Sequence, residues 1–184
     1  MKRGLWGLAL TAYLMASNCV DCSNVYQVTD KVYRSAQLNS GKFGEVIKQN
    51  KIKTVINLRG YHPEREWYQT EVEACKGLGV QHHSIPFSSW EIERQDILDL
   101  LMLFDMSERP ILIHCNSGTD RAAFASAVFR IYGDGDKPED AIEELSLSRG
   151  HLSIGRKKVL RQIIERFGHE GNGRSFEEWV RQDY

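Results

Sequence analysis

The feature that most constrains the fold is an alternation of short apolar runs with stretches whose apolar residues recur at helical spacing. The apolar runs, which predict buried strands, are 53–58, 80–85 and 111–114. The stretches with helical spacing are 37–49, 63–79, 92–106 and 121–132. Strands that alternate with helices are typical of an α/β domain with a largely parallel central sheet.

The two ends of this pattern add a hairpin and a helical tail. Residues 25–28 and 31–34 alternate around Thr29-Asp30, which predicts a small β-hairpin. Three more helices are predicted at 138–147, 154–167 and 175–181. We therefore expect a three-layer α/β sandwich, formed by a single domain over 24–184.

The charge balance excludes a general attraction to polyanions. The 184 residues include 24 Lys and Arg against 25 Asp and Glu, and 41% of the residues are hydrophobic. A chain with so little net charge has no overall field that would draw it to nucleic acid. Any anion site must be local, and no nucleic-acid partner is expected.

The N-terminus has the pattern of an export signal. Lys2 and Arg3 precede an uncharged, mostly apolar run over 4–17. This run is shorter than the roughly 20 residues of a membrane-spanning helix. We expect residues 1–22 to be a leader, with the protein periplasmic or membrane-anchored and touching the membrane only through it. A buried N-terminal helix and lipid attachment at Cys19 or Cys22 are the alternatives.

The strongest chemical signal is the run His114-Cys115-Asn116-Ser117-Gly118-Thr119-Asp120-Arg121, between a predicted strand and a predicted helix. Loop amides and a helix N-terminus together form an anion cradle, and Gly118 supplies the backbone freedom of a tight turn. Positive potential there favours the thiolate of Cys115, which is a nucleophile. Arg121, six residues later, could hold two oxygens of the same phosphate.

The pattern H-C-x-x-G-x-x-R resembles the signature loop of the protein tyrosine phosphatase superfamily. The segments 32–37 and 54–59 further resemble its compact bacterial dual-specificity members, and the likeness is good over about 25–132. The resemblance implies that Cys115 is the nucleophile and that Arg121 binds phosphate. It also implies that His114 supports the loop and that amides of Asn116, Ser117, Gly118, Thr119 and Asp120 bind phosphate. A chance match, with Cys115 an inert core thiol, is the alternative.

Two positions depart from that family's pattern. Ala122 replaces the usual Ser or Thr after the arginine, so the second chemical step is expected to be slow. The segment 85–90 lacks the aspartate that protonates the leaving group. Asp120 is our first candidate for this acid, because the related myotubularins carry an aspartate there; Glu91 and Asp96 follow. Asp120 could instead cap the next helix, and Glu91 could only favour a first helical turn.

Other polar residues are expected near the pocket. Arg59, His62 and Arg65 could rim it, and Arg149 and His151 could approach from the helical side. No grouping of His, Cys and carboxylates has metal-ligand spacing, and phosphocysteine chemistry needs no metal, so neither metal nor cofactor is expected. Cys75 is predicted to be a buried free thiol, and the protein to be a monomer.

Three functions remain open from the sequence. The first is an exported phosphatase of phosphorylated proteins or peptides, mainly phosphotyrosine. The second is a phosphoinositide or inositol polyphosphate phosphatase, although relatives of that kind tend to have lysines where Asn116, Ser117 and Thr119 stand. The third is a phosphate-recognition module of low activity. A thiol-redox role is weaker, because Arg121 suits a dianion.

Overall fold

A computed structural model describes residues 23–184 and contains one five-stranded sheet. The strands are β1 (Tyr26–Gln27), β2 (Val32–Ser35), β3 (Thr54–Asn57), β4 (Gln81–Ser84) and β5 (Ile111–His114), in the order β1-β2-β5-β3-β4. The predicted hairpin pairs β1 with β2 in antiparallel fashion, and all other pairs are parallel. The carboxyl ends of β2, β5, β3 and β4 therefore meet at one edge of the sheet.

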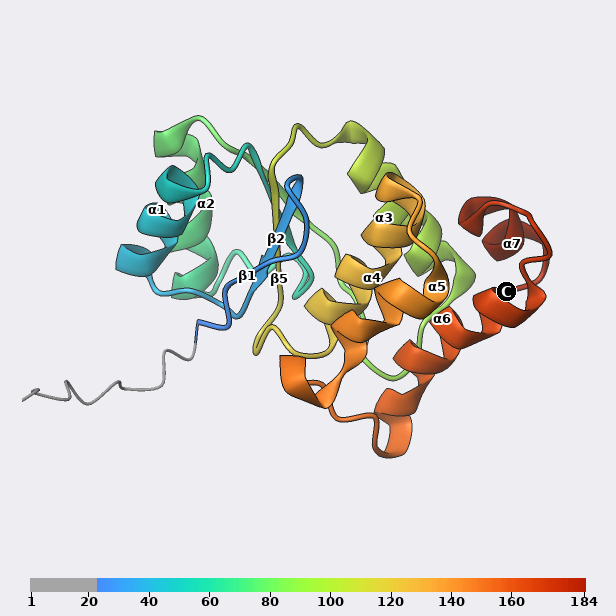
Figure 1. Cartoon of the computed structure of the whole chain (residues 1–184). Helices are drawn as coiled ribbons and strands as arrows, with labels where there is room; N and C mark the ends of the chain where they lie inside the picture. Colours follow the sequence, from blue (N-terminus) through green and yellow to red (C-terminus); the bar gives the residue numbers. More distant parts are fainter. Residues whose placement is uncertain (1–22) are drawn as a thin grey trace, which may run out of the picture.

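Helices cover both faces of this sheet (Figure 1). On one face lie α1 (Ser40–Gln49) and α2 (Glu66–Leu78). The opposite face carries α3 (Arg94–Met106), α4 (Arg121–Asp134), α5 (Pro138–Ala141), α6 (Lys158–Glu170) and α7 (Phe176–Gln182). Three short 3₁₀ helices precede α6: η1 (Ile142–Leu145), η2 (Leu147–Arg149) and η3 (Gly155–Lys157). This arrangement confirms the predicted three-layer α/β sandwich.

The central strand β5 divides the core in two. Ile111, Leu112 and Ile113 are all fully buried, but successive side chains of a strand point to opposite faces. Ile111 and Ile113 accordingly pack with α3 and α4, whereas Leu112 packs with α1 and α2. A strand buried on both faces reads as a continuous apolar run, which is the pattern that the sequence showed.

The bounds of several predicted helices differ from those observed, and the helices predicted at 63–79 and 138–147 are two examples. Pro63 was expected to open the second helix, but Arg65 N–H donates to His62 O in a turn and α2 begins at Glu66. The predicted helix 138–147 is α-helical only to Ala141 and continues as 3₁₀ turns. The buried residues of α2 are Tyr68, Glu71 and Cys75, so Cys75 is buried as predicted.

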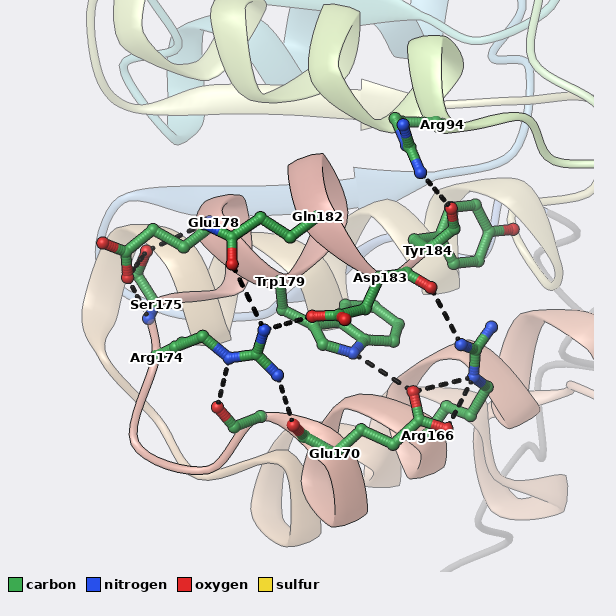
Figure 2. A network of polar contacts seen from close by, with 11 residues as sticks. Arg94, Arg166, Glu170, Arg174, Ser175, Glu178, Trp179, Gln182, Asp183 and Tyr184 are labelled. Atoms are coloured by element: carbon green, nitrogen blue, oxygen red, sulfur yellow. Dashed lines mark hydrogen bonds and ion pairs between the residues drawn. The ribbon is translucent and has the colours of Figure 1, made fainter.

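The C-terminal helix is held by the polar network in Figure 2. Ser175 and Glu178 form a reciprocal capping box at the start of α7, and Arg174 pairs with Asp183 at its end. Trp179 is fully buried and its indole N–H donates to Glu170 on α6. Helix α7 thus contributes to the hydrophobic core and is held against α6. The network also reaches α3, because Arg94 donates to the Tyr184 carbonyl.

The leader predicted over 1–22, with Cys19 and Cys22, lies outside the described residues. From residue 23 onward, no helix is long and apolar enough to cross a membrane.

Candidate active site

The loop between β5 and α4 forms a turn around the sulfur of Cys115. Cys115 follows directly after β5 and is only 1% exposed. The backbone N–H of Gly118 donates to its Sγ at 3.2 Å. Because α4 begins at Arg121, the positive end of that helix also faces the loop. The arrangement stabilises negative charge at the sulfur.

Gly118 is required at its position for two reasons. Its φ is +75°, which is the left-handed region that favours glycine. A Cβ there would lie 2.7 Å from Ala36 N and from the carbonyl carbon of Ser35, at the end of β2. The loop is therefore pressed against β2 backbone that cannot move aside.

Other hydrogen bonds fix the rest of the loop. Gln37 N–H donates to Asn116 O, and the side-chain amide of Asn24 donates to Ser117 O. The hydroxyls of Ser117 and Thr119 lie 2.9 Å apart. The structure thus brings together the residues predicted from the motif. Segments that are distant in the sequence, around Asn24 and Gln37, hold the loop in shape.

Arg121 is one of the residues that line a neighbouring cavity. Its Nη1 donates to the carbonyls of Leu58 at 3.2 Å and Phe87 at 3.5 Å, which come from the loops after β3 and β4. The cavity has a volume of about 400 Å³ and is lined by Arg59, Pro86, Phe87, Ser88, Ser89, Trp90 and Arg121. Burial lowers the pKa of Arg59, and the nearby Arg121 lowers it further. Two guanidinium groups therefore face one apolar-walled cavity, which suits an anion.

Asp120 is held by two cationic or donor side chains from the helical side. His151 Nδ1 lies 2.9 Å from its Oδ1, and Lys157 Nζ lies 2.6 Å from its Oδ2. Burial alone would raise the pKa of Asp120, but these two hydrogen bonds outweigh it and hold the pKa below the ordinary value of 3.8. Its side chain does not cap α4, contrary to one of the two sequence interpretations.

His114 rests on a buried carboxylate that the sequence interpretation missed. Glu71 Oε1 accepts from His114 Nε2 at 3.0 Å and from His82 Nε2 at 2.8 Å. Burial by itself would raise the pKa of Glu71, yet the two imidazoles and Gln37 lower it to about 2. A buried, ionised carboxylate thus fixes the histidine that precedes Cys115.

The Glu71 network continues to the cavity. Gln37 donates to Glu71 Oε2 at 2.7 Å and accepts from Arg59 at 2.8 Å. The guanidinium of Arg59 stacks on the Trp67 ring, 3.5 Å from its centroid. A chain of polar contacts therefore links the base of the loop to one of the two arginines in the cavity.

The remaining sequence-predicted residues lie in various places. Glu91 is exposed, next to Trp90 and outside the first turn of α3 that was proposed for it. Asp96 completes a capping box with Glu93 and so serves the start of α3. Arg65 pairs with Glu64 at the surface, and Arg149 pairs with the buried Glu144.

Of the two contributors that the sequence interpretation missed, Glu71 gave a partial signal in the sequence and Lys157 gave none. Glu71 stands four residues before Cys75 on the buried stripe of α2, so a carboxylate on an apolar helix face was the available signal. Lys157 gave no signal, because its contact with Asp120 depends on how the segment before α6 folds back. Within 23–184 no three His, Cys, Asp or Glu side chains are placed to hold a metal ion.

Part of the chain is similar in sequence to known proteins. No family model matches the chain. The Dual specificity protein phosphatase TpbA of Pseudomonas aeruginosa is 26% identical over 125 residues, which cover 66% of this chain and 53% of TpbA. The Beta-lactamase hydrolase-like protein of Xylella fastidiosa is 26% identical over 134 residues, 72% of this chain and 30% of that protein. The chain thus spans about half of TpbA and less of the second relative.

Solved structures show the same architecture. The crystal structure of P. aeruginosa TpbA aligns with a TM-score of 0.62 and 21% identity, covering 80% of this chain and 89% of that one. The core catalytic domain of the PP-IP phosphatase SIW14 from S. cerevisiae, solved with citrate, aligns with a TM-score of 0.62 and 22% identity, covering 77% and 83%. The fold is that of dual-specificity-type phosphatases. In its loop, its sequence relatives and its fold, the chain is thus similar to cysteine-based protein tyrosine phosphatase-like proteins.

Proposed function

We propose that this protein hydrolyses phosphate monoesters through a phosphocysteine intermediate. The observation that carries the proposal is the Gly118 amide directed at the Cys115 sulfur at the N-terminus of α4. In the first step the thiolate of Cys115 attacks phosphorus, the bond to the leaving oxygen breaks, and an acid protonates that oxygen. In the second step water attacks phosphorus and gives a proton to the conjugate base of that acid, the S–P bond breaks, and inorganic phosphate and the thiolate are released. Arg121 and the loop amides balance the phosphoryl charge throughout.

Phosphotyrosine is the substrate that we propose first. Pro86, Phe87 and Trp90 give the cavity beside Arg121 apolar and aromatic walls, against which a phenyl ring can pack. TpbA, a relative, has also been solved as a cysteine-to-serine variant in complex with phosphotyrosine.

Release of phosphate from a phosphotyrosine peptide tests this function. The wild type is expected to release phosphate and, after an acid quench, to retain labelled phosphate on Cys115. Cys115→Ser should do neither, and Cys75→Ser is the matched control, because Cys75 is a buried free thiol in the other core cluster. Tight peptide binding without any hydrolysis by the wild type would instead establish the recognition module.

A second candidate substrate follows from Arg59. An inositol polyphosphate carries several phosphates, and Arg59 lines the same cavity as Arg121. SIW14, a structural neighbour, is described as a PP-IP phosphatase. If the second phosphate binds there, Arg59→Gln should reduce turnover of inositol polyphosphate much more than that of phosphotyrosine. Arg65→Gln, which removes an exposed arginine paired with Glu64, is the control.

Asp120 remains our proposal for the general acid, with one condition set by its contacts. The paired carboxylate is ionised at neutral pH, so it can donate a proton only after substrate binding weakens its contact with Lys157. Asp120→Asn should then lose far more rate on phosphotyrosine than on an activated aryl phosphate. Equal losses on both substrates would exclude Asp120 and turn attention to Glu91.

We also propose that the protein acts in the periplasm, on the strength of the apolar leader pattern. Fractionation of the native host, with detection of the mature N-terminus, would test this location.

A further inference from the structure

The segment from Ser146 to Lys158, which we call the basic loop, joins η1 to α6 and exposes large aliphatic side chains. Leu147 is 72% exposed, Leu152 51% and Ile154 67%. Three aliphatic groups exposed to this degree within eight residues favour contact with an apolar phase, because covering them lowers the free energy. They protrude singly from turns, rather than forming the face of a long helix.

The basic loop also carries unbalanced positive charge. It has four basic residues, Arg149, Arg156, Lys157 and Lys158, and no Asp or Glu. Arg149 pairs with Glu144 and Lys157 with Asp120. Among residues 23–184, Arg156 and Lys158 form no ion pair. The exposed aliphatic groups are therefore flanked by cations that are available to an external anion.

The basic loop lies directly against the candidate active site. A Cβ on Gly150 would lie 3.0 Å from Thr119 Cγ2, so the backbone of the basic loop touches the phosphate-binding loop. His151 and Lys157 both contact Asp120. In Figure 1 the basic loop, in orange, lies at the lower edge of the molecule just before α6.

Two exposed aromatic residues belong to other loops near the candidate site. Trp90 is 55% exposed and lines the cavity, and Tyr61, 70% exposed, follows Arg59 and Gly60. They belong to the loops after β4 and β3, which are at the same edge of the sheet as Cys115. Five of the seven exposed large hydrophobic residues described thus belong to loops that adjoin the candidate site; the other two are Met102 and Met106 on α3.

We propose that this face docks on an anionic lipid membrane, with the basic loop as the main contact and Trp90 and Tyr61 at the interface. Isolated protruding aliphatic side chains suit insertion among acyl chains, whereas peptide recognition uses grooves that enclose side chains. Aromatic residues prefer the headgroup level, and Lys and Arg bind anionic headgroups. Docking through the basic loop would bring the phosphate-binding loop, which it touches, close to the bilayer surface. The inference does not depend on the activity proposed above.

Hydrogen exchange on the full chain tests the docking locally. The protein is mixed with vesicles of phosphatidylcholine alone or with added phosphatidylglycerol. Amides of 147–156 are expected to exchange more slowly only with phosphatidylglycerol. This readout separates the basic loop from the N-terminal segment, because membrane contact through that segment would protect only residues before 23.

Sedimentation with vesicles compares the membrane binding of matched variants. Leu152→Ser with Ile154→Ser should weaken binding roughly tenfold or more, since two apolar side chains lose their burial. Met102→Ser with Met106→Ser removes two comparably exposed residues from α3 and should leave binding unchanged. Arg156→Gln with Lys158→Gln should weaken binding to the vesicles that contain phosphatidylglycerol, because it removes two cations that bind anionic headgroups.

Three results would overturn the proposal. The first is no protection of 147–156 by anionic vesicles. The second is equal binding by the two double serine variants. The third is protection of the basic loop by an acidic phosphopeptide but not by vesicles, which would make this face a protein-recognition surface.

Discussion

Replacing Glu71 by Gln should remove a large, pH-dependent part of the stability of the protein. The side chain is 3% exposed and is held by His114, His82 and Gln37. Gln keeps the size of the side chain and one oxygen acceptor, but it removes the negative charge on which these contacts depend.

The magnitude follows from the pKa of Glu71, which falls from 4.5 to about 2 in the folded protein. At about 1.36 kcal/mol per pKa unit, this shift corresponds to about 3 kcal/mol of folding free energy at neutral pH. Because the folded pKa is depressed, this stability is fully present above pH 4.5 and is lost as the pH falls toward 2.

Urea unfolding of the wild type and Glu71→Gln measures the effect. The variant should be about 3 kcal/mol less stable at pH 7, and the difference should shrink steadily as the pH falls below 4.5. Other carboxylates contribute to acid unfolding, so the difference between the proteins is the relevant quantity. Glu73→Gln, which changes an exposed residue on the same helix, is the control and should match the wild type at every pH.

Two results would refute this reasoning. One is a stability difference that stays constant between pH 7 and the acid range, which would show that shape and not charge is lost. The other is a variant as stable as the wild type at pH 7, which would show that the buried carboxylate gains nothing from its histidines.

Three further predictions concern other buried groups. Gly135→Ala should cost only the strain of its φ of +75°, about 1–3 kcal/mol, because nothing lies near its Cβ position. Gly118→Ala has the same φ and also meets the backbone of β2, so it should disrupt the loop and cost more stability; thermal unfolding compares the two variants. Cys75 should resist iodoacetamide in the native protein, because burial raises its pKa to about 12, and mass-detected modification before unfolding would contradict this. Arg34→Met should cost about 3–5 kcal/mol in urea unfolding, because it removes a partner of the fully buried Glu144; a cost below 1 kcal/mol would show that Arg149 and Arg130 suffice for Glu144.

The sequence predicted the parts of the fold that local pattern determines. The apolar run of β5, the loop after it and the start of α4 are contiguous, so their order and spacing already contain the strand, turn and helix. Cys115, Gly118 and Arg121 are accordingly where the motif placed them.

Residues whose contacts come from distant parts of the sequence were harder to predict. The apolar spacing of 63–79 predicted a helix, but it did not indicate that the charged Glu71 is one of its buried residues. A rule that places carboxylates outside has no way to anticipate a glutamate whose burial is compensated by two histidines from β4 and β5.

The contacts of Asp120 show the same limit. His151 and Lys157 reach it from a segment of turns, whose course depends on packing and not on periodicity. A sequence interpretation could only offer helix capping as the alternative role for Asp120, and the structure shows no such cap.

The close approach of Gly118 to Ser35 and Ala36 has a consequence for protein engineering. The eight residues from His114 to Arg121 do not determine the conformation of the loop by themselves, because the backbone at the end of β2 packs directly against them. Grafting this octapeptide between a strand and a helix of an unrelated scaffold should give a chain that matches the signature but does not bind phosphate. A successful transplant would have to bring the end of β2 with it.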